Sequence, residues 1–151
     1  MRIQKLSAKN RGEVSRLLRN YWNTREMYYA KRWTDHYLKE GHKIEIKKDQ
    51  FFSIAEKGKL IGCISAIIYE GNVAELRDFI IKPEYRKKGL GRKTINEMII
   101  WCRKQDVRKI YSLTFPSKQR FLSRLKFKKE GLLKSHFKRG EDMVIMSRFL
   151  K

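Results

Sequence analysis

The sequence predicts one α/β (α+β) domain built on a mixed, mostly antiparallel sheet. With 151 residues, the chain has room for one hydrophobic core and hardly for two. It contains only two prolines and no repeat or low-complexity segment that would mark a linker, so we expect a single domain over residues 1–151. Strand and helix patterns follow one another in the order β-α-α-β-β-β-α-β-α-β-β.

The N-terminal part is expected to contain one strand and two helices. Residues 2–6 have the pattern of a short strand, and Asn10 is a suitable N-cap for a helix with apolar side chains at helical spacing. A second helix over residues 24–38 stops near Gly41. Its aromatic face favours packing against the sheet, and an acceptor pocket is the alternative. The side chains concerned are Trp22, Tyr29, Trp33 and Tyr37, with Glu26 and His36 beside them.

A hairpin and a strand-helix-strand unit are expected next. Apolar residues 51–55 and 60–69 flank a turn that contains Gly58, which is typical of a hairpin. Strand 73–81 ends at Pro83, because proline cannot continue a sheet ladder. Helix 90–104 carries apolar side chains on one face and leads to strand 109–114. Strands 73–81 and 109–114 should therefore be parallel neighbours, joined by a right-handed crossover.

The C-terminal residues predict a short helix over residues 117–125 and a closing antiparallel pair, 127–137 with 143–149.

The chain is strongly basic, with 37 Lys and Arg against 16 Asp and Glu and a net charge of +21. Such a charge attracts nucleic acid, ribosomes or a phosphorylated cofactor, although the cations are spread along the whole chain and match no RNA-binding module. No apolar run approaches the roughly 20 residues that span a bilayer. We expect a cytoplasmic protein without membrane contact, in which Cys63 and Cys102 are buried free thiols.

Residues 82–92 predict a phosphate site. Gly89 and Gly91 let the backbone approach a ligand closely, and the helix that begins there presents unpaired N–H groups and the positive end of its dipole. Lys87, Lys88 and Arg92 add positive charge that suits a diphosphate. The alternative is an ordinary strand-to-helix turn that uses glycine for its dihedral angles.

The motif Arg86-x-x-Gly89-x-Gly91, after an apolar strand and Pro83, resembles the acetyl-CoA signature of the GNAT superfamily of N-acetyltransferases. It lacks the spacing of dinucleotide folds and of P-loops. The resemblance covers about residues 2–149. It implies the GNAT fold, with a seven-stranded sheet, helices on both faces and a central parallel strand pair that splays apart. It also implies direct transfer of acetyl from acetyl-CoA to a primary amine, and homodimers are common among relatives.

The resemblance further implies which residues bind acetyl-CoA. The amides of residues 87–92 would hold the diphosphate, and the backbone at the end of strand 73–81 would pair with the pantetheine arm. The expected cofactor-binding residues are Phe79, Ile80, Ile81, Arg86, Lys87, Lys88, Gly89, Leu90, Gly91 and Arg92. An N–H of Ile80 or Ile81 would also stabilise negative charge on the thioester oxygen.

Glu75 is the candidate catalytic base. An alkyl amine with a pKa near ~10 must lose a proton before it can attack, and some GNAT members carry a functional glutamate at this position. Strict alternation along the strand places Glu75 on the same face as Phe79. A structural ion pair with Arg77 is the alternative role, and Asp78 is the second candidate base.

One stretch departs from the family pattern. Phe121 to Phe127 resembles Phe-Tyr-x-x-x-Gly-Phe, in which the tyrosine often protonates the departing thiolate. Leu122 cannot donate a proton, and Lys126 replaces the glycine. Two alternatives therefore stay open: the thiolate leaves without a dedicated acid, or the acid is Ser117, Ser123, Tyr111 or water. A catalytically weak acyl-CoA-binding or nucleic-acid-associated module is the alternative function. No metal site is expected, since the three histidines lack ligand spacing.

Overall fold

The computed structural model describes residues 8, 12 and 45–150. The chain divides into two compact units, residues 1–46 and 47–151. The described helices and strands belong to the second unit, except that the first strand begins at Ile46, the last residue of the first unit. The predicted strand 2–6, the two predicted N-terminal helices and the aromatic residues from Trp22 to Tyr37 lie outside the described residues. The described elements are β1 (Ile46–Glu56), β2 (Lys59–Tyr69), β3 (Val73–Ile81), the 3-10 helix η3 (Pro83–Tyr85), α3 (Leu90–Lys104), β4 (Lys109–Thr114), α4 (Pro116–Ser123), β5 (Lys128–Lys138) and β6 (Glu141–Phe149).

The six described strands form one mixed sheet in the order β1-β2-β3-β4-β6-β5. Neighbours β2 and β3, β4 and β6, and β5 and β6 are antiparallel, whereas β3 and β4 are parallel. The predicted parallel pair and the closing antiparallel pair are thus confirmed. Strand β1 begins five residues earlier than the predicted strand, at Ile46.

Tight turns connect the first three strands. Lys57 and Gly58 have φ values of 47° and 75°, and Gly71 and Asn72 have φ values of 80° and 58°. Two successive left-handed residues match the twist of a two-residue hairpin, and glycine and asparagine adopt that conformation more readily than other residues. The predicted hairpin turn at Gly58 is therefore confirmed.

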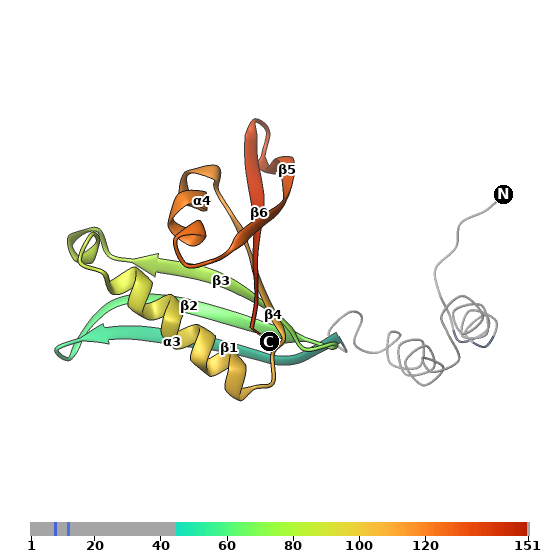
Figure 1. Cartoon of the computed structure of the whole chain (residues 1–151), viewed down its shortest axis with the longest axis horizontal. Coiled ribbons are helices and arrows are strands. Elements are labelled where there is room, and N and C mark those ends of the chain that lie inside the picture. The colour runs from blue at the N-terminus through green and yellow to red at the C-terminus, as the bar shows by residue number, and fades with distance from the viewer. Residues whose placement is uncertain (1–7, 9–11, 13–44, 151) are drawn as a thin grey trace. The chain divides into compact units, whose positions relative to one another are not determined.

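Helix α3 covers one face of the sheet and contributes to a single core (Figure 1). Its apolar stripe is buried against alternate side chains of β2 and β3, which follows from the 3.6-residue period of the helix and the two-residue period of the strands. The helix contributes Ile95, Met98, Ile99 and Cys102, and the two strands contribute Ile64, Ala66, Ile68, Ala74 and Leu76. Within the described residues, no helix is long and apolar enough to cross a membrane.

Strand β3 contains a bulge at Asp78. Cys63 pairs with Ile80 and Ser65 pairs with Arg77, so one residue of β2 lies opposite two residues of β3. Asp78 adopts a φ of 51°, and its carboxylate accepts a 2.6 Å hydrogen bond from the Ser65 hydroxyl. The bulge interrupts the alternation of side chains along β3.

The bulge corrects the expectation that Glu75 and Phe79 share a face. Phe79 packs against the core that contains Ala74 and Leu76, whereas Glu75 points to the opposite face. The extra residue at Asp78 shifts the two-residue period by one, so a strictly alternating pattern predicts the wrong face beyond that point.

Helix α4 ends in a turn that resembles one built on glycine. Lys126 donates a hydrogen bond to the Ser123 carbonyl and Phe127 donates one to the Leu122 carbonyl, as in a Schellman motif. Lys126 has a φ of 65° at the position where this motif favours glycine. The turn is therefore kept although the glycine is replaced, at a cost in backbone strain.

Candidate functional site

Strands β3 and β4 separate in the middle of the sheet. They pair over only three residues each, and Glu75 opposite Tyr111 is the last pair. Beyond this point β4 stays with β6 as far as Thr114, while β3 stays with β2 as far as Ile81. Figure 1 shows the two halves of the sheet diverging from this point. The splayed parallel pair implied by the family resemblance is present, and among the described residues it leaves one side of the β3 backbone without a strand partner.

The backbone groups of β3 alternate between β2 and the vacated side. Lys82 donates its N–H to the Ile61 carbonyl, and the Ile80 carbonyl lies beside Gly62, so residues 80 and 82 face β2. Phe79 and Ile81 therefore direct their N–H and C=O groups to the side that β4 has left. Of the three residues expected to pair with an extended ligand, these two have suitable backbone directions.

Gly62 allows β2 to approach the end of β3 closely. A Cβ atom built at this position would overlap the Ile80 carbonyl oxygen and would lie 3.1 Å from the Ile81 side chain. Only glycine fits there without moving the backbone of β3. Gly62 was not among the residues predicted from the sequence, where a lone glycine inside a strand pattern was the available signal.

The loop after β3 presents free amides at the start of α3. Gly89 precedes the helix with a φ of 77°, and its carbonyl accepts the first helical bond, from the Lys93 N–H. The amides of Leu90, Gly91 and Arg92 consequently precede the intrahelical ladder. Among the described residues, no atom outside its chain neighbours lies within 4 Å of a Cβ built at Gly89, so the space on that side of Gly89 is open.

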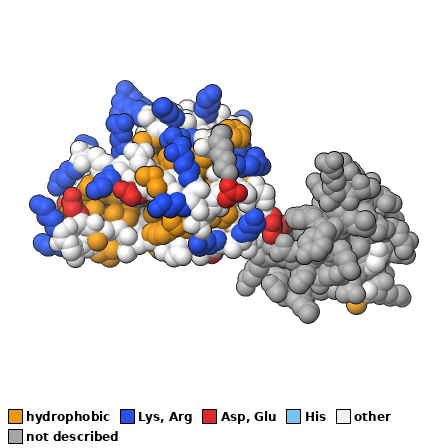
Figure 2. Space-filling view, turned by 60° about the horizontal axis from the view of Figure 1, so that its bottom comes forward, with side chains coloured by type: hydrophobic (Ala, Val, Ile, Leu, Met, Phe, Trp, Pro, Cys, Tyr) orange, Lys and Arg blue, Asp and Glu red, His pale blue; other side chains and the backbone are white. Residues whose placement is uncertain are grey.

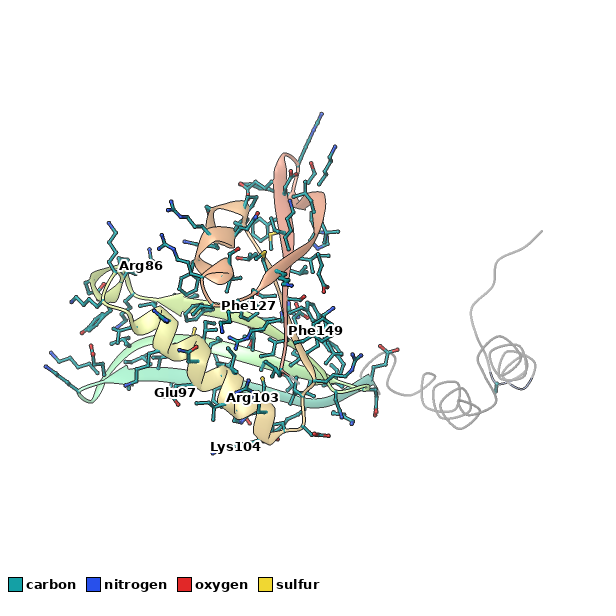
Figure 3. The ribbon with its side chains drawn as sticks, in the orientation of Figure 1. Arg86, Glu97, Arg103, Lys104, Phe127 and Phe149 are labelled. Atoms are coloured by element: carbon teal, nitrogen blue, oxygen red, sulfur yellow. The ribbon has the colours of Figure 1, made fainter. Side chains whose placement is uncertain are left out.

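Positive charge surrounds these amides. Lys87, Lys88, Arg92 and Lys93 are exposed, and the Lys88 ammonium lies 5.5 Å from the centre of the Tyr85 ring. Figure 3 shows Arg86 beside the start of α3 and Arg103 and Lys104 near its opposite end. The helix dipole and the loop cations act in the same direction, so the loop fits a diphosphate. Its predicted residues are thus brought together in one place.

Arg86 is tied to the end of β3. Its Nε donates a 2.8 Å hydrogen bond to the Ile81 carbonyl, which is one of the groups on the vacated side. The guanidinium therefore fixes the junction between strand and loop, a role that the sequence motif alone did not indicate. The guanidinium has further N–H groups, and their planar, forked arrangement suits hydrogen bonds to phosphate oxygens.

Gly91 packs on two aromatic rings. A Cβ atom at Gly91 would lie 3.4 Å from the Phe121 ring and 3.6 Å from the Phe79 ring, which is ordinary contact. The two rings are stacked with centroids 6.4 Å apart. Phe79 thus supports the loop with its side chain while its backbone faces the vacated side of β3.

Glu75 lies in a polar cluster on the sheet face opposite α3. It is 8% exposed, and its Oε2 accepts hydrogen bonds from the hydroxyls of Tyr69, at 2.9 Å, and Tyr111, at 3.3 Å. The Arg77 Nε lies 3.8 Å from Oε1. Burial, followed by the interaction with Glu75, raises the pKa of both tyrosines, so they remain protonated donors at neutral pH. Glu75 thus has the expected contact with Arg77, but it is buried, whereas a glutamate in an ordinary surface ion pair would be exposed.

The other candidate groups lie elsewhere. Leu122 is buried in the core, and Asp78 is engaged by Ser65 at the bulge. Ser117 and Ser123 are exposed at the two ends of α4. Tyr111 donates its hydroxyl proton toward Glu75. Among the described residues, no group of three His, Cys, Asp or Glu side chains could hold a metal ion, and Cys63 and Cys102 are free.

Residues 14–127 match the model of the Acetyltransferase (GNAT) family. The chain belongs to this family. The expected GNAT membership and fold class are thereby confirmed.

Individual GNAT relatives are distant. An uncharacterised N-acetyltransferase of Chlorobaculum tepidum is 31% identical over 67 residues, which cover 44% of this chain and 43% of that relative. The match thus spans less than half of the relative's length.

Solved GNAT structures share the fold. An aminoglycoside 6'-N-acetyltransferase complexed with coenzyme A has a TM-score of 0.64 and 16% identity, covering 100% of this chain and 98% of its own. The ribosomal-protein-S18-alanine N-acetyltransferase from Escherichia coli has a TM-score of 0.58 and 21% identity, covering 70% and 71%.

Proposed function

We propose that this chain transfers the acetyl group of acetyl-CoA to a primary amine. The observation that carries the proposal is that β3, after it separates from β4, leads through one short loop into the free amides at the start of α3. An extended backbone edge that leads into an anion-binding helix terminus suits a ligand with a peptide-like arm and a diphosphate. Membership of the acetyltransferase family supports the same ligand.

Two groups of residues would hold acetyl-CoA. Phe79 and Ile81 offer backbone groups to its arm, and Ile80 completes the strand between them, with its own backbone turned to β2. The loop residues Arg86, Lys87, Lys88, Gly89, Leu90, Gly91 and Arg92 offer amides and cations to its phosphates. When bound, acetyl-CoA supplies the reactive thioester.

Glu75 is the proposed catalytic base. Its carboxylate lies at the last residue pair before β3 and β4 separate, next to the start of the vacated edge. A carboxylate there can take a proton from an ammonium group, directly or through a water molecule, and free the nitrogen lone pair for attack. The N–H of Ile81 points to the vacated side of β3, which makes it the better oxyanion donor of the two that the sequence suggested.

The acceptor is proposed only as a class, a primary amine on a small molecule, peptide or protein. The similar structures are named for an aminoglycoside and for the alanine of a ribosomal protein. A chain with net charge +21 repels polycationic acceptors over distances within the Debye length. Acceptors that carry a single amine, or that are bound to a polyanion, are therefore favoured.

The decisive experiment combines binding and turnover. Titration calorimetry of the whole protein with acetyl-CoA should register binding, and Gly89→Val should abolish it, because a β-branched residue cannot adopt φ 77° without strain. Gly140→Val, a matched change at φ 81° in the distant β5–β6 turn, should leave binding intact. Thiol release with a panel of an aminoglycoside, spermidine, a lysine peptide and an alanine N-terminal peptide then tests transfer. Absence of binding would reject the proposal.

A second candidate is a nucleic-acid-associated module that binds acyl-CoA but turns it over weakly. Two observations favour it. Leu122 carries no proton donor, and residues 107–129, which include β4, α4 and the start of β5, contain no Asp or Glu. The exposed cations from α4 to the start of β5 are Lys118, Arg120, Arg124, Lys126, Lys128 and Lys129. Figure 2 shows Lys and Arg side chains over much of the visible described surface. RNA binding whose affinity falls steeply with salt, with acetyl-CoA bound but no amine acetylated, would support this candidate.

Three further proposals concern the whole chain. We propose one domain over residues 1–151, because the family match runs across the boundary between its two compact units. A cytoplasmic location is supported by the two free cysteines. A homodimer is supported by β5, an edge strand with Leu132 and Phe137 exposed, and sedimentation of the purified protein would test it.

A further inference from the structure

We propose that Tyr69 and Tyr111 are positioning residues that hold one oxygen of Glu75 and leave its other oxygen to receive the proton of the acceptor amine. This inference rests on the proposed function, because it assigns geometry to the proposed base. It concerns two residues that no part of the family motif contains.

The two tyrosines reach the same oxygen from opposite sides of β3. Tyr69 lies at the end of β2 and donates to Oε2 over 2.9 Å, and Tyr111 lies on β4 directly opposite Glu75 and donates to Oε2 over 3.3 Å. Two donated hydrogen bonds fix the carboxylate within its plane. The carboxylate therefore has one orientation, set by strands on both sides.

Oε1 keeps its capacity to accept a proton. The Arg77 Nε lies 3.8 Å from it, which is beyond hydrogen-bonding distance, so Arg77 contributes charge without occupying the oxygen. In the proposed step an N–H bond of the acceptor ammonium breaks, the proton moves to Oε1, and the electron pair stays on nitrogen. The nitrogen is then a neutral nucleophile.

The charged groups of β3 and β4 that neighbour Glu75 each interact with a partner. Arg77 follows Glu75 on β3, Asp78 is bonded to Ser65 of β2, and Lys109 precedes Tyr111 on β4. Lys109 forms a 2.8 Å ion pair with Glu130 of β5. The two phenols are thus the groups that contact the carboxylate by hydrogen bonds, and burial keeps both of them protonated.

The test measures kcat/KM against pH with the best amine of the panel. Each phenol stabilises the charged carboxylate, so Tyr69→Phe and Tyr111→Phe should each move the acidic limb of the profile upward by about one pH unit. Ser147→Ala removes another buried hydroxyl on the same face, opposite Tyr111, and should leave the limb in place. Glu75→Gln should remove the limb.

A second readout does not depend on turnover. Carbon-13 NMR of the Glu75 carboxyl, assigned with Glu75→Gln, should show the same upward movement of its titration in Tyr69→Phe and Tyr111→Phe. The inference would be overturned if both the acidic limb of the kcat/KM profile and the NMR titration of Glu75 stayed in place in Tyr69→Phe and Tyr111→Phe, whether or not these variants melt at a lower temperature. If the wild-type protein acetylates no amine, the proposed function fails, and the NMR titration still decides whether the tyrosines hold the carboxylate.

Discussion

Gly62 determines how closely β2 can approach the end of β3, and its replacement gives the first prediction. Gly62→Ala would push a methyl group into the Ile80 carbonyl and should lower the free energy of unfolding by about 1–3 kcal/mol. Gly131→Ala is the matched control, because its Cβ would meet only the end of the Ile145 side chain, at 3.3 Å. Urea denaturation of both variants tests this. Equal losses would show that the close approach at Gly62 has no special cost.

The same change should weaken acetyl-CoA binding if the vacated side of β3 pairs with its arm. Displacement of Ile80 would carry the neighbouring backbone groups of Phe79 and Ile81 with it. Calorimetry on folded Gly62→Ala protein should therefore show a lower affinity than Gly131→Ala. An unchanged affinity would place the arm elsewhere.

Lys126 gives a prediction of opposite sign. A φ of 65° destabilises the folded state by roughly 1–2 kcal/mol for a residue with a Cβ. Glycine removes this strain, but part of the gain is offset because glycine also gives the unfolded chain more conformational entropy. Lys126→Gly should therefore raise the free energy of unfolding by up to about 1 kcal/mol, whereas Lys126→Ala should not. Thermal melts of the two variants distinguish strain relief from loss of the lysine charge.

For single residues, the sequence indicated local chemical properties better than it indicated which residues contact one another in the fold. The loop glycines and cations could be proposed as a phosphate site from the sequence because their chemistry is local. The face of Phe79 was not, because a bulge at Asp78 leaves no simple pattern in the sequence. Tyr111 lies 36 residues from Glu75, so only the parallel register could bring them together.

The two ends of helix α3 are expected to contribute differently to coenzyme A binding. Lys87→Gln and Lys88→Gln should each weaken coenzyme A binding about two- to five-fold at low salt, since a charge beside a helix terminus contributes roughly 0.3–1 kcal/mol. Lys104→Gln, at the opposite end of the helix, should not (Figure 3). The measurement is calorimetric affinity at two salt concentrations, and a difference that persists in high salt would contradict an electrostatic origin.

The described elements were predicted with small errors in their limits. Strand 73–81, helix 90–104 and strand 109–114 coincide with β3, α3 and β4, since proline and glycine mark their ends. The start of β1 was missed because residues 46–50 are mostly charged or polar, with exposed side chains in an edge strand. Helix α4 starts at Pro116 rather than residue 117, as proline commonly occupies the first turn.

For the whole molecule, alkaline pH should be destabilising. Burial raises the pKa of Cys102 from 9.0 to about 12 and also raises the pKa of Tyr111. Above about pH 9 the unfolded chain loses protons that the folded chain keeps, so stability that is complete below pH 9 falls as the pH rises toward 12. Each such group contributes a slope of up to about 1.4 kcal/mol per pH unit.

Urea denaturation between pH 8 and 11 tests this. The slope against pH should be smaller in Cys102→Ala, even though the cavity lowers the stability at every pH. The same slope in both proteins would mean that Cys102 does not remain protonated in the fold. Cys63, which is half-buried on β2 beside the bulge of β3, is the suitable comparison in Cys63→Ala.

The fold class of the molecule followed from the order of its elements, because one helix between two apolar strands allows few topologies. The separation of β3 from β4 entered only through the family resemblance. Nothing in the composition of residues 76–81 or 112–114 indicates that these strands stop pairing, since both segments have ordinary strand character.

Main-chain atoms line the gap left by β4, and every amino acid except proline supplies the same ones. Substitutions around Glu75 and Tyr111 are therefore expected to change which amine the proposed enzyme accepts and to leave the proposed binding of the acyl donor intact. The proposed acceptor specificity can thus change separately from the proposed binding of acetyl-CoA.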